Sequence, residues 1–152
     1  MSTHCENYGG IVRELKTKAT VFVSGSFGDR LAMPIIVSAL WDTGAYSSVV
    51  SQRVVDALGL TEVARNHACG VNGWYESPIY VIDLQLPNGV KITGLPVSLG
   101  NMVIADVLIG MDVISKGDLK LTNDGTTKFT LRTPSEGDAP FVTSKTVQEG
   151  EK

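Results

Sequence analysis

The sequence predicts an all-β domain that contains one short helix. Most of the chain is made of short segments rich in β-branched, aromatic and aliphatic residues, and these segments are separated by turns with glycine, asparagine or proline. Only in the stretch 48–60 do the apolar residues recur at the spacing of a helix, and Gly59 is in position to end that helix. The apolar face of the predicted helix consists of Val50, Val54, Val55 and Leu58. With 152 residues and 43% hydrophobic content, the chain is long enough to bury one core of ordinary size.

The predicted strands fill the central part of the chain. The first is 20–24, and a glycine-containing turn separates it from the second, 31–41. Two glycines around Val71 and Asn72 predict a tight hairpin tip between β-prone arms within 63–81. Further β-prone segments occur at 79–86, 90–92, 95–99, 107–109, 119–121 and 128–131.

The two ends of the chain differ from this central part. Residues 1–18 mix two glycines and several charges with one short apolar pair, which indicates a flexible arm or an edge strand. Residues 134–152 are polar and more acidic than basic, which is typical of a flexible tail. We therefore expect a single domain at 19–133 between an N-terminal arm and a polar C-terminal tail.

Charge and composition narrow the functional classes. A net charge of −3 and a pI near 5.3 provide no electrostatic basis for binding nucleic acid. No apolar run approaches the length of a membrane span, and the first residues do not resemble a signal segment. The two cysteines, Cys5 and Cys69, do not form a disulfide framework. These features predict a cytoplasmic protein without nucleic-acid or membrane partners.

The most informative stretch is the end of the predicted strand 31–41. The strand is almost continuously apolar, and it leads directly into Asp42, Thr43 and Gly44. A lone buried carboxylate costs several kcal/mol, so Asp42 either has a partner or lies in an exposed turn. In the simpler interpretation, Asp42 is a turn or N-cap residue before the predicted helix.

The surroundings of Asp42 favour a catalytic interpretation. An apolar strand precedes the Asp-Thr-Gly tripeptide, Ala45 follows it, and a second apolar segment ending in glycine, Val107-Leu108-Ile109-Gly110, occurs later. This set resembles the retropepsin-like aspartic proteases over about 19–133. The two segments look like halves of an internal pseudo-repeat in which only the first carries the aspartate. The resemblance implies a closed retropepsin-like acid protease barrel with one short helix, and a homodimer.

The homodimer follows from the chemistry that the resemblance implies. Hydrolysis of peptide bonds by aspartates needs two carboxylates that share one proton. This chain contains one Asp-Thr-Gly loop, so the second Asp42 has to come from a second copy across a two-fold axis. The catalytic residues are then Asp42, Thr43 and Gly44. In this assignment, the Thr43 hydroxyl bonds across the dimer, and Gly44 allows the substrate backbone to approach the carboxylates.

The resemblance also implies residues that bind the polypeptide substrate. A glycine-rich hairpin closes over the substrate in this family, and Gly70-Val71-Asn72-Gly73 looks like its tip. The alternative is an ordinary surface hairpin, with Trp74 packed beneath it rather than lining the cleft. The full set of expected substrate-binding residues is Ala45, Gly70, Val71, Asn72, Gly73, Trp74 and Ile109.

Some positions depart from the retroviral pattern or suggest other sites. Met111 and Asp112 stand where retroviral enzymes have an arginine and an asparagine, and Arg53 or Arg13 is the expected partner of Asp112 instead. Two His and Cys pairs lack the usual spacing of zinc ligands, and we expect neither a metal site nor a cofactor. These pairs are His4 with Cys5 and His67 with Cys69.

Two functions from different classes remain on the sequence alone. The first is an aspartic endopeptidase that forms its dyad across a homodimer. The second is a retropepsin-like dimerisation or peptide-binding module with little or no proteolytic turnover. A β-barrel binding domain outside the family is a broader alternative, and it differs because only the protease has to dimerise through Asp42. The intact Asp-Thr-Gly-Ala sequence favours the endopeptidase.

Overall fold

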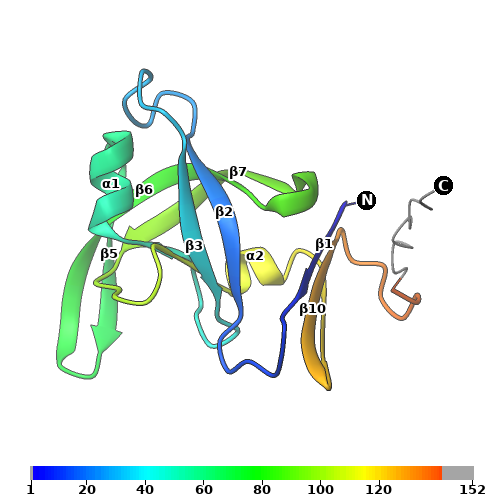
Figure 1. Cartoon of the computed structure of the whole chain (residues 1–152). Coiled ribbons are helices and arrows are strands. Elements are labelled where there is room, and N and C mark those ends of the chain that lie inside the picture. The colour runs from blue at the N-terminus through cyan, green and yellow to red at the C-terminus, as the bar shows by residue number, and fades with distance from the viewer. Residues whose placement is uncertain (1, 142–152) are drawn as a thin grey trace.

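Two β-sheets form the protein, whose computed structural model describes residues 2–141 (Figure 1). The smaller sheet has the order β1-β10-β9, and it consists of β1 (Ser2–Asn7), β10 (Thr126–Thr133) and β9 (Asp118–Asp124). The larger sheet has the order β2-β3-β8-β4-β7-β6-β5, and β2 also pairs with β6. Its strands are β2 (Lys16–Val23), β3 (Ile35–Trp41), β4 (Val49–Val50), β5 (Ala64–Gly70), β6 (Gly73–Gln85), β7 (Lys91–Leu99) and β8 (Val107–Ile109). The architecture confirms the predicted all-β class.

In the strands β2 and β3, buried residues alternate with more exposed ones. Thr17, Ala19 and Val21 of β2 are buried, and the residues between them are more exposed. β3 buries Val37, Ala39 and Trp41 in the same way. Because side chains along a strand point alternately to opposite faces, this period of two directs one face of each strand into the core.

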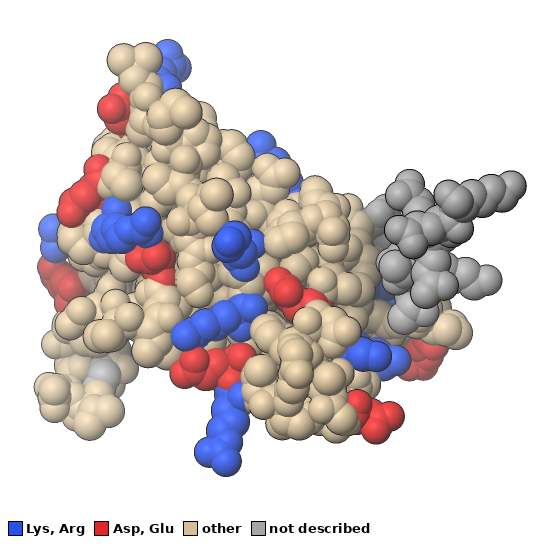
Figure 2. Space-filling model, in the orientation of Figure 1, with Lys and Arg blue, Asp and Glu red and all other residues tan. Residues whose placement is uncertain are grey.

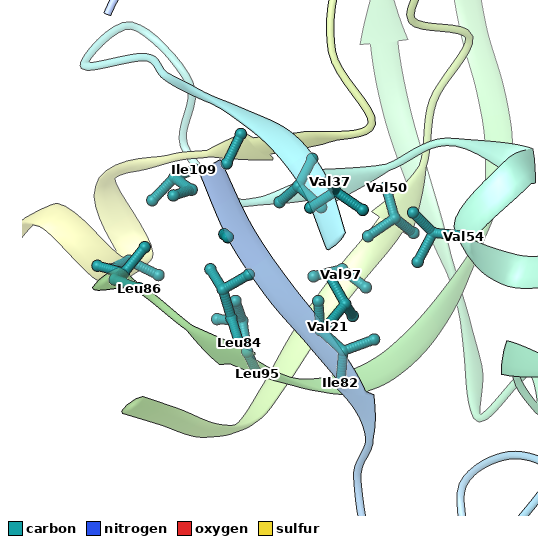
Figure 3. Packing of buried hydrophobic residues seen from close by; sticks show 14 of the residues in the cluster. Val21, Val37, Val50, Val54, Ile82, Leu84, Leu86, Leu95, Val97 and Ile109 are labelled. Atoms are coloured by element: carbon teal, nitrogen blue, oxygen red, sulfur yellow. The ribbon is translucent and has the colours of Figure 1, made fainter. Parts of the chain in front are cut away.

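The core lies between the strands of the larger sheet and α1. Figure 3 shows the aliphatic side chains that converge around β2, and all of them are almost completely buried. The labelled residues come from β2, β3, β4, β6, β7, β8, the helix α1 and the position between β6 and η1, and they are Val21, Val37, Val50, Val54, Ile82, Leu84, Leu86, Leu95, Val97 and Ile109. Burial of these side chains contributes about 1.5–3 kcal/mol each relative to exposure. The core therefore fixes the positions of the strand ends that carry Asp42.

The predicted helix forms as α1 (Gln52–Leu58), which is shorter than the stretch that we expected. Val54, Val55 and Leu58 are buried as predicted, whereas Val50 belongs to β4. Gly59 ends the helix with a φ of 51°, a left-handed conformation that favours glycine. A 3-10 turn, η1 (Pro87–Gly89), and a single helical turn, α2 (Met111–Ile114), were not predicted.

A buried polar group connects the smaller sheet to β2 and β3. The His4 ring on β1 lies 3.3 Å from the Thr17 hydroxyl and 3.4 Å from the Pro87 carbonyl. The Trp41 indole N–H donates to the same Thr17 hydroxyl at 2.8 Å. His4 and Thr17 are almost fully buried, so these bonds replace the hydration that both lose. The N-terminal segment thus contains a paired edge strand that reaches the residue before Asp42.

The segment that follows β10 wraps around Arg132. The Arg132 guanidinium is 3% exposed, bonds Asp118 at 2.7 Å, and donates to the carbonyls of Gly137, Ala139 and Pro140. The sequence predicted a flexible tail from residue 134, yet residues 134–141 are anchored here because a buried guanidinium needs several acceptors. The rest of that expected tail, 142–152, lies outside the described residues.

Within the part of the chain that the structure describes, no helix is long and apolar enough to cross a membrane.

Candidate active site

Asp42 lies in the turn that follows β3. Its carboxylate is half-buried, and Oδ1 accepts a hydrogen bond from the Gly44 N–H at 2.8 Å. The Ala45 N–H donates to the Asp42 carbonyl at 3.2 Å, which closes the turn. Thr43 and Gly44 are exposed, and Ala45 is half-buried. Within residues 2–141, no lysine or arginine forms an ion pair with Asp42.

The backbone of Asp42 is held by the neighbouring strand β8. β3 and β8 are parallel, with Trp41 opposite Ile109, and the Asp42 N–H donates to the Ile109 carbonyl at 2.9 Å. The two segments that resembled halves of a pseudo-repeat therefore lie side by side. Gly110 passes close to the Asp42 turn, where an added Cβ would lie 2.8 Å from the Ser47 backbone. Only glycine fits this crossing without moving the main chain.

A second set of hydrogen bonds joins the Asp42 turn to α2. Ser48 is fully buried, and its hydroxyl donates to Asp112 Oδ1 at 2.8 Å while accepting from the Gly110 N–H at 3.1 Å. The Ser48 N–H donates to Asp112 Oδ2 at 2.9 Å, so both carboxylate oxygens are used. Asp112 thus anchors the far end of the turn through Ser48, and not through the expected ion pair with Arg53 or Arg13.

Arg53 has a different partner. Its guanidinium bonds Asp106 at 2.8 Å, and the Ser51 hydroxyl bonds the same carboxylate at 3.1 Å. Both contacts lie beside a cavity of about 520 Å³ between α1, the first half of β6 and the β7–β8 connection. Val107–Ile109 separates Asp106 from Gly110, so this cavity is at the opposite end of β8 from the Asp42 turn. The sequence contains no periodic or motif signal for the Ser48–Asp112 or Arg53–Asp106 pairs, because both join residues more than 50 positions apart.

The predicted hairpin forms from β5 and β6. Gly70 pairs with Gly73, so Val71 and Asn72 form the tip, and Gly73 has a φ of 105°. Val71 is fully exposed and Trp74 is 77% exposed, so Trp74 does not pack beneath the hairpin. An exposed hairpin tip is a segment of low local stability, which allows it to move relative to the rest of the sheet.

One predicted substrate-binding residue occupies a different place from the one expected. The Ile109 side chain is fully buried in the core, and this residue reaches the Asp42 turn through its carbonyl group. The half-buried Leu108 points to the opposite face of β8. The sequence could not distinguish the two neighbours because both are apolar and the strand is only three residues long.

The parts of the candidate site point to one side of the molecule. The β5–β6 hairpin, the turn after β3, the β1–β2 connection and the β9–β10 turn all extend toward the lower edge in Figure 1. In Figure 2, acidic and basic side chains are interspersed on the visible face, and the hairpin at the lower left carries few charges. Among the described residues, no group of His, Cys, Asp and Glu side chains is placed to hold a metal ion.

Comparison with known proteins supports the fold at low sequence identity. No protein-family model and no curated protein matches the chain. A retropepsin-like aspartic protease from Rickettsia conorii aligns with a TM-score of 0.54 and 13% identity, over 85% of this chain and 93% of that chain. EIAV protease, in complex with the inhibitor HBY-793, aligns with a TM-score of 0.46 and 16% identity, over 71% of this chain and 90% of that chain. The similarity to the Rickettsia protein confirms the fold predicted from the Asp42 turn and its partner segment, and the chain has the retropepsin-like fold.

Proposed function

We propose that this protein is an aspartic endopeptidase that forms its catalytic dyad from Asp42 of two identical chains. The observation that carries the proposal is the state of the Asp42 carboxylate. Oδ1 is fixed by the Gly44 N–H, no cation neutralises the group within residues 2–141, and the turn faces outward. A half-buried aspartate whose carboxylate is fixed by a backbone N–H and has no ionic partner among residues 2–141 is suited to meet a second carboxylate.

In the proposed dimer, the two Asp42 carboxylates share one proton because two neighbouring negative charges repel each other. The ionised carboxylate accepts a proton from a water molecule, which attacks the carbonyl carbon of the peptide bond. The protonated carboxylate donates a hydrogen bond to the carbonyl oxygen and stabilises the charge that develops there. Proton transfer to the leaving nitrogen then completes hydrolysis and restores the dyad for another cycle.

The β5–β6 hairpin is proposed to close over an extended polypeptide. Its two-residue tip between Gly70 and Gly73 exposes backbone groups that can bond a substrate backbone, and Trp74 offers an apolar surface. Ala45 in the Asp42 turn and the half-buried Leu108 would line the substrate cleft beneath the hairpin. Support for a polypeptide substrate comes from this arrangement and from the fold shared with the Rickettsia protease.

Cleavage of an unfolded protein by wild type and by Asp42→Asn tests the proposal. Over about pH 4 to 7.5, we expect the substitution to lower turnover at least about a hundredfold, because one amide cannot replace an ionised general base. Asp56→Asn, an exposed change on α1, is the matched control and should retain activity. Equal cleavage by wild type and Asp42→Asn would refute the dyad. Peptide binding without cleavage by the wild-type dimer would support the binding-module alternative.

A further inference from the structure

A pocket of about 260 Å³ lies between the start of β7, the region of α2 and β10. Residues 90–93, Val113, Lys116, Leu131 and Thr133 line it, and none of them belongs to the Asp42 turn. We call this feature the β7 pocket.

The floor of the β7 pocket is aliphatic. Val90, Val113 and Leu131 are each at most 4% exposed, and the half-buried Ile92 lies beside them in the lining. These side chains provide an apolar surface without ionisable groups. The floor is therefore suited to an aliphatic side chain of a ligand.

The charged groups of the β7 pocket are both cations. Lys91 and Lys116 are exposed, and the lining contains no aspartate or glutamate, although the whole chain has a net charge of −3. Lys116 forms no ion pair within residues 2–141. The Lys91 ammonium lies 3.9 Å from Asp83, and the other oxygen of that carboxylate accepts from the Gly94 N–H. Two cations above an aliphatic floor are complementary to an anion that carries an aliphatic group.

The β7 pocket also runs along a backbone edge. Four consecutive residues, 90–93, line it, although neighbouring side chains of a strand point to opposite faces, so the pocket lies at the edge of β7 and not over one face. One side of β7 pairs with β6, and the other side pairs with β4 only at Ser98 and Leu99. On that second side, residues 91–97 have no strand partner in the part of the chain that the structure describes. Free N–H and C=O groups at such an edge can pair with an extended peptide.

We propose that the β7 pocket binds the C-terminal end of an extended peptide whose last residue is aliphatic. The terminal carboxylate lies between Lys91 and Lys116, the last side chain packs on the aliphatic floor, and the peptide backbone follows the free edge of β7. The free edge favours a peptide over a fatty acid, because a fatty acid has no amide groups to pair with a strand.

This binding site goes beyond the proposed function and does not contain Asp42. Hydrolysis of a peptide bond creates a new C-terminal carboxylate, so products of the proposed reaction that end in an aliphatic residue belong to the class of ligand that the β7 pocket takes. Only this link to the products rests on the proposed function.

Isothermal titration calorimetry of the full chain tests the site. The probes are two acetylated pentapeptides that end in leucine, one with a free C-terminal carboxylate and one with an amide. We expect the carboxylate form to bind at least about tenfold more tightly, because it alone forms charge-assisted hydrogen bonds with the lysines. Equal affinity of the two peptides, or binding of neither, would overturn the proposal.

Lys116→Gln locates the binding at the β7 pocket. The change removes the unpaired ammonium, and the dissociation constant of the carboxylate peptide should rise at least about tenfold. Lys128→Gln is the matched control, because Lys128 is an exposed lysine of β10 outside the lining, and its removal changes the net charge by the same amount. Equal weakening by both variants would reduce the effect to general charge and refute the site.

The pairing with β7 is tested on the peptide instead of the protein. Because the N–H groups of a strand point alternately to its two sides, N-methylation of one of two neighbouring amides should weaken binding about tenfold, whereas methylation of the other should not. Octanoate should bind more weakly than the peptide. Octanoate that binds as tightly as the peptide would show a site for aliphatic acids and would overturn the peptide assignment.

The outcomes separate this inference from the proposed function. Asp42→Asn should bind the carboxylate peptide as wild type does. If cleavage needs Asp42 but the peptide fails to bind, or binds Lys116→Gln as tightly as wild type, the β7 pocket is refuted and the proposed function stands. If the peptide binds in a way that depends on Lys116 while no cleavage occurs, the proposed function fails and the site stands.

Discussion

At the scale of single residues, the Asp42 turn is shaped by side chains that do not touch the reacting atoms. Ser48 accepts from the Gly110 N–H and donates to Asp112, while the Asp112 carboxylate also accepts from the Ser48 and Val113 amides. The Asp112 carboxylate thus accepts from three donors and holds Ser48, at the end of the Asp42 turn, against the start of α2. Hydrogen bonds to a charged acceptor are the stronger ones in proteins, so Asp112 is a positioning residue of the candidate site.

Asp112→Asn tests this role. The change replaces one acceptor oxygen by an amide NH2 group that cannot accept from Ser48, and we expect a loss of about 1–3 kcal/mol in the free energy of unfolding. Urea denaturation measures the loss. Asp56→Asn, which alters an exposed contact with Gln52, should change stability by less than about 0.5 kcal/mol. Equal stability of the two variants would show that Asp112 does not hold the turn.

At the scale of elements, the β5–β6 hairpin differs from the strands around it. Residues 79–85 of β6 pair with β7, and the last four of them also pair with β2, whereas the first four residues of β6 and the hairpin tip are exposed. Val71 and Asn72 at the tip are exposed, and the turn depends on the backbone at Gly73, where φ is 105°. Residues other than glycine rarely adopt that conformation.

Gly73→Ala should therefore impair function more than stability. A non-glycine residue at such a position costs about 1–3 kcal/mol of backbone strain. An exposed tip can relieve this strain by adopting a different turn conformation, so the urea midpoint should change little. We expect cleavage to fall about tenfold, because the altered tip no longer fits over the substrate. Gly9→Ala is the control, because Gly9 has ordinary φ and no atom within 4 Å of an added Cβ. A Gly73→Ala enzyme that cleaves at the wild-type rate would argue against a closing role for this hairpin.

At the scale of the whole molecule, His4 links stability to pH. Burial lowers the pKa of His4 below its ordinary value of 6.5, although Glu6 and the Pro87 carbonyl act in the opposite direction. The folded protein therefore keeps His4 neutral at pH values where the unfolded chain binds a proton. The contribution of His4 to the free energy of unfolding is therefore fully present above about pH 6.5 and decreases as the pH falls below that value.

His4→Gln should remove this part of the pH dependence. The neutral amide retains hydrogen-bonding groups near Thr17 and Pro87, so the variant should fold. Between pH 7.5 and 5.5, we expect wild type to lose about 1 kcal/mol more than the variant in the free energy of unfolding. His67→Gln, at an exposed position on β5, should behave as wild type. An unchanged pH slope in His4→Gln would exclude His4 as the cause.

Asp118 makes stability depend on pH in a separate, more acidic pH range. Hydrogen bonds from Ser135, the Glu136 amide and Arg132 lower the pKa of Asp118 to about 2 from its ordinary 3.8. Its contribution is present above about pH 4 and is lost only as the pH falls toward 2. As the pH falls, the protein therefore loses the stabilisation by neutral His4 first and the stabilisation by ionised Asp118, which holds the segment after β10, only at lower pH.

The sequence by itself determined the parts of this protein that depend on local pattern. The β-prone segments, the glycine that ends α1 and the two-residue hairpin tip all follow from residues close together in the chain. These features predicted the all-β class. The Asp-Thr-Gly sequence after an apolar segment, together with Val107-Leu108-Ile109-Gly110, carried the resemblance that predicted the retropepsin-like fold.

Only the tertiary structure decided which distant residues meet. The Ser48–Asp112 anchor joins residues far apart in the sequence, and the segment 134–141 folds back onto Arg132. Burial of Ile109 rather than Leu108 depends on which of two apolar neighbours on β8 faces the core. Their placement depends on the order of strands and on packing of the complete core, and neither leaves a periodic pattern in the sequence. The pairing of β3 with β8 then brings two apolar segments together so that a single aspartate is held at the surface.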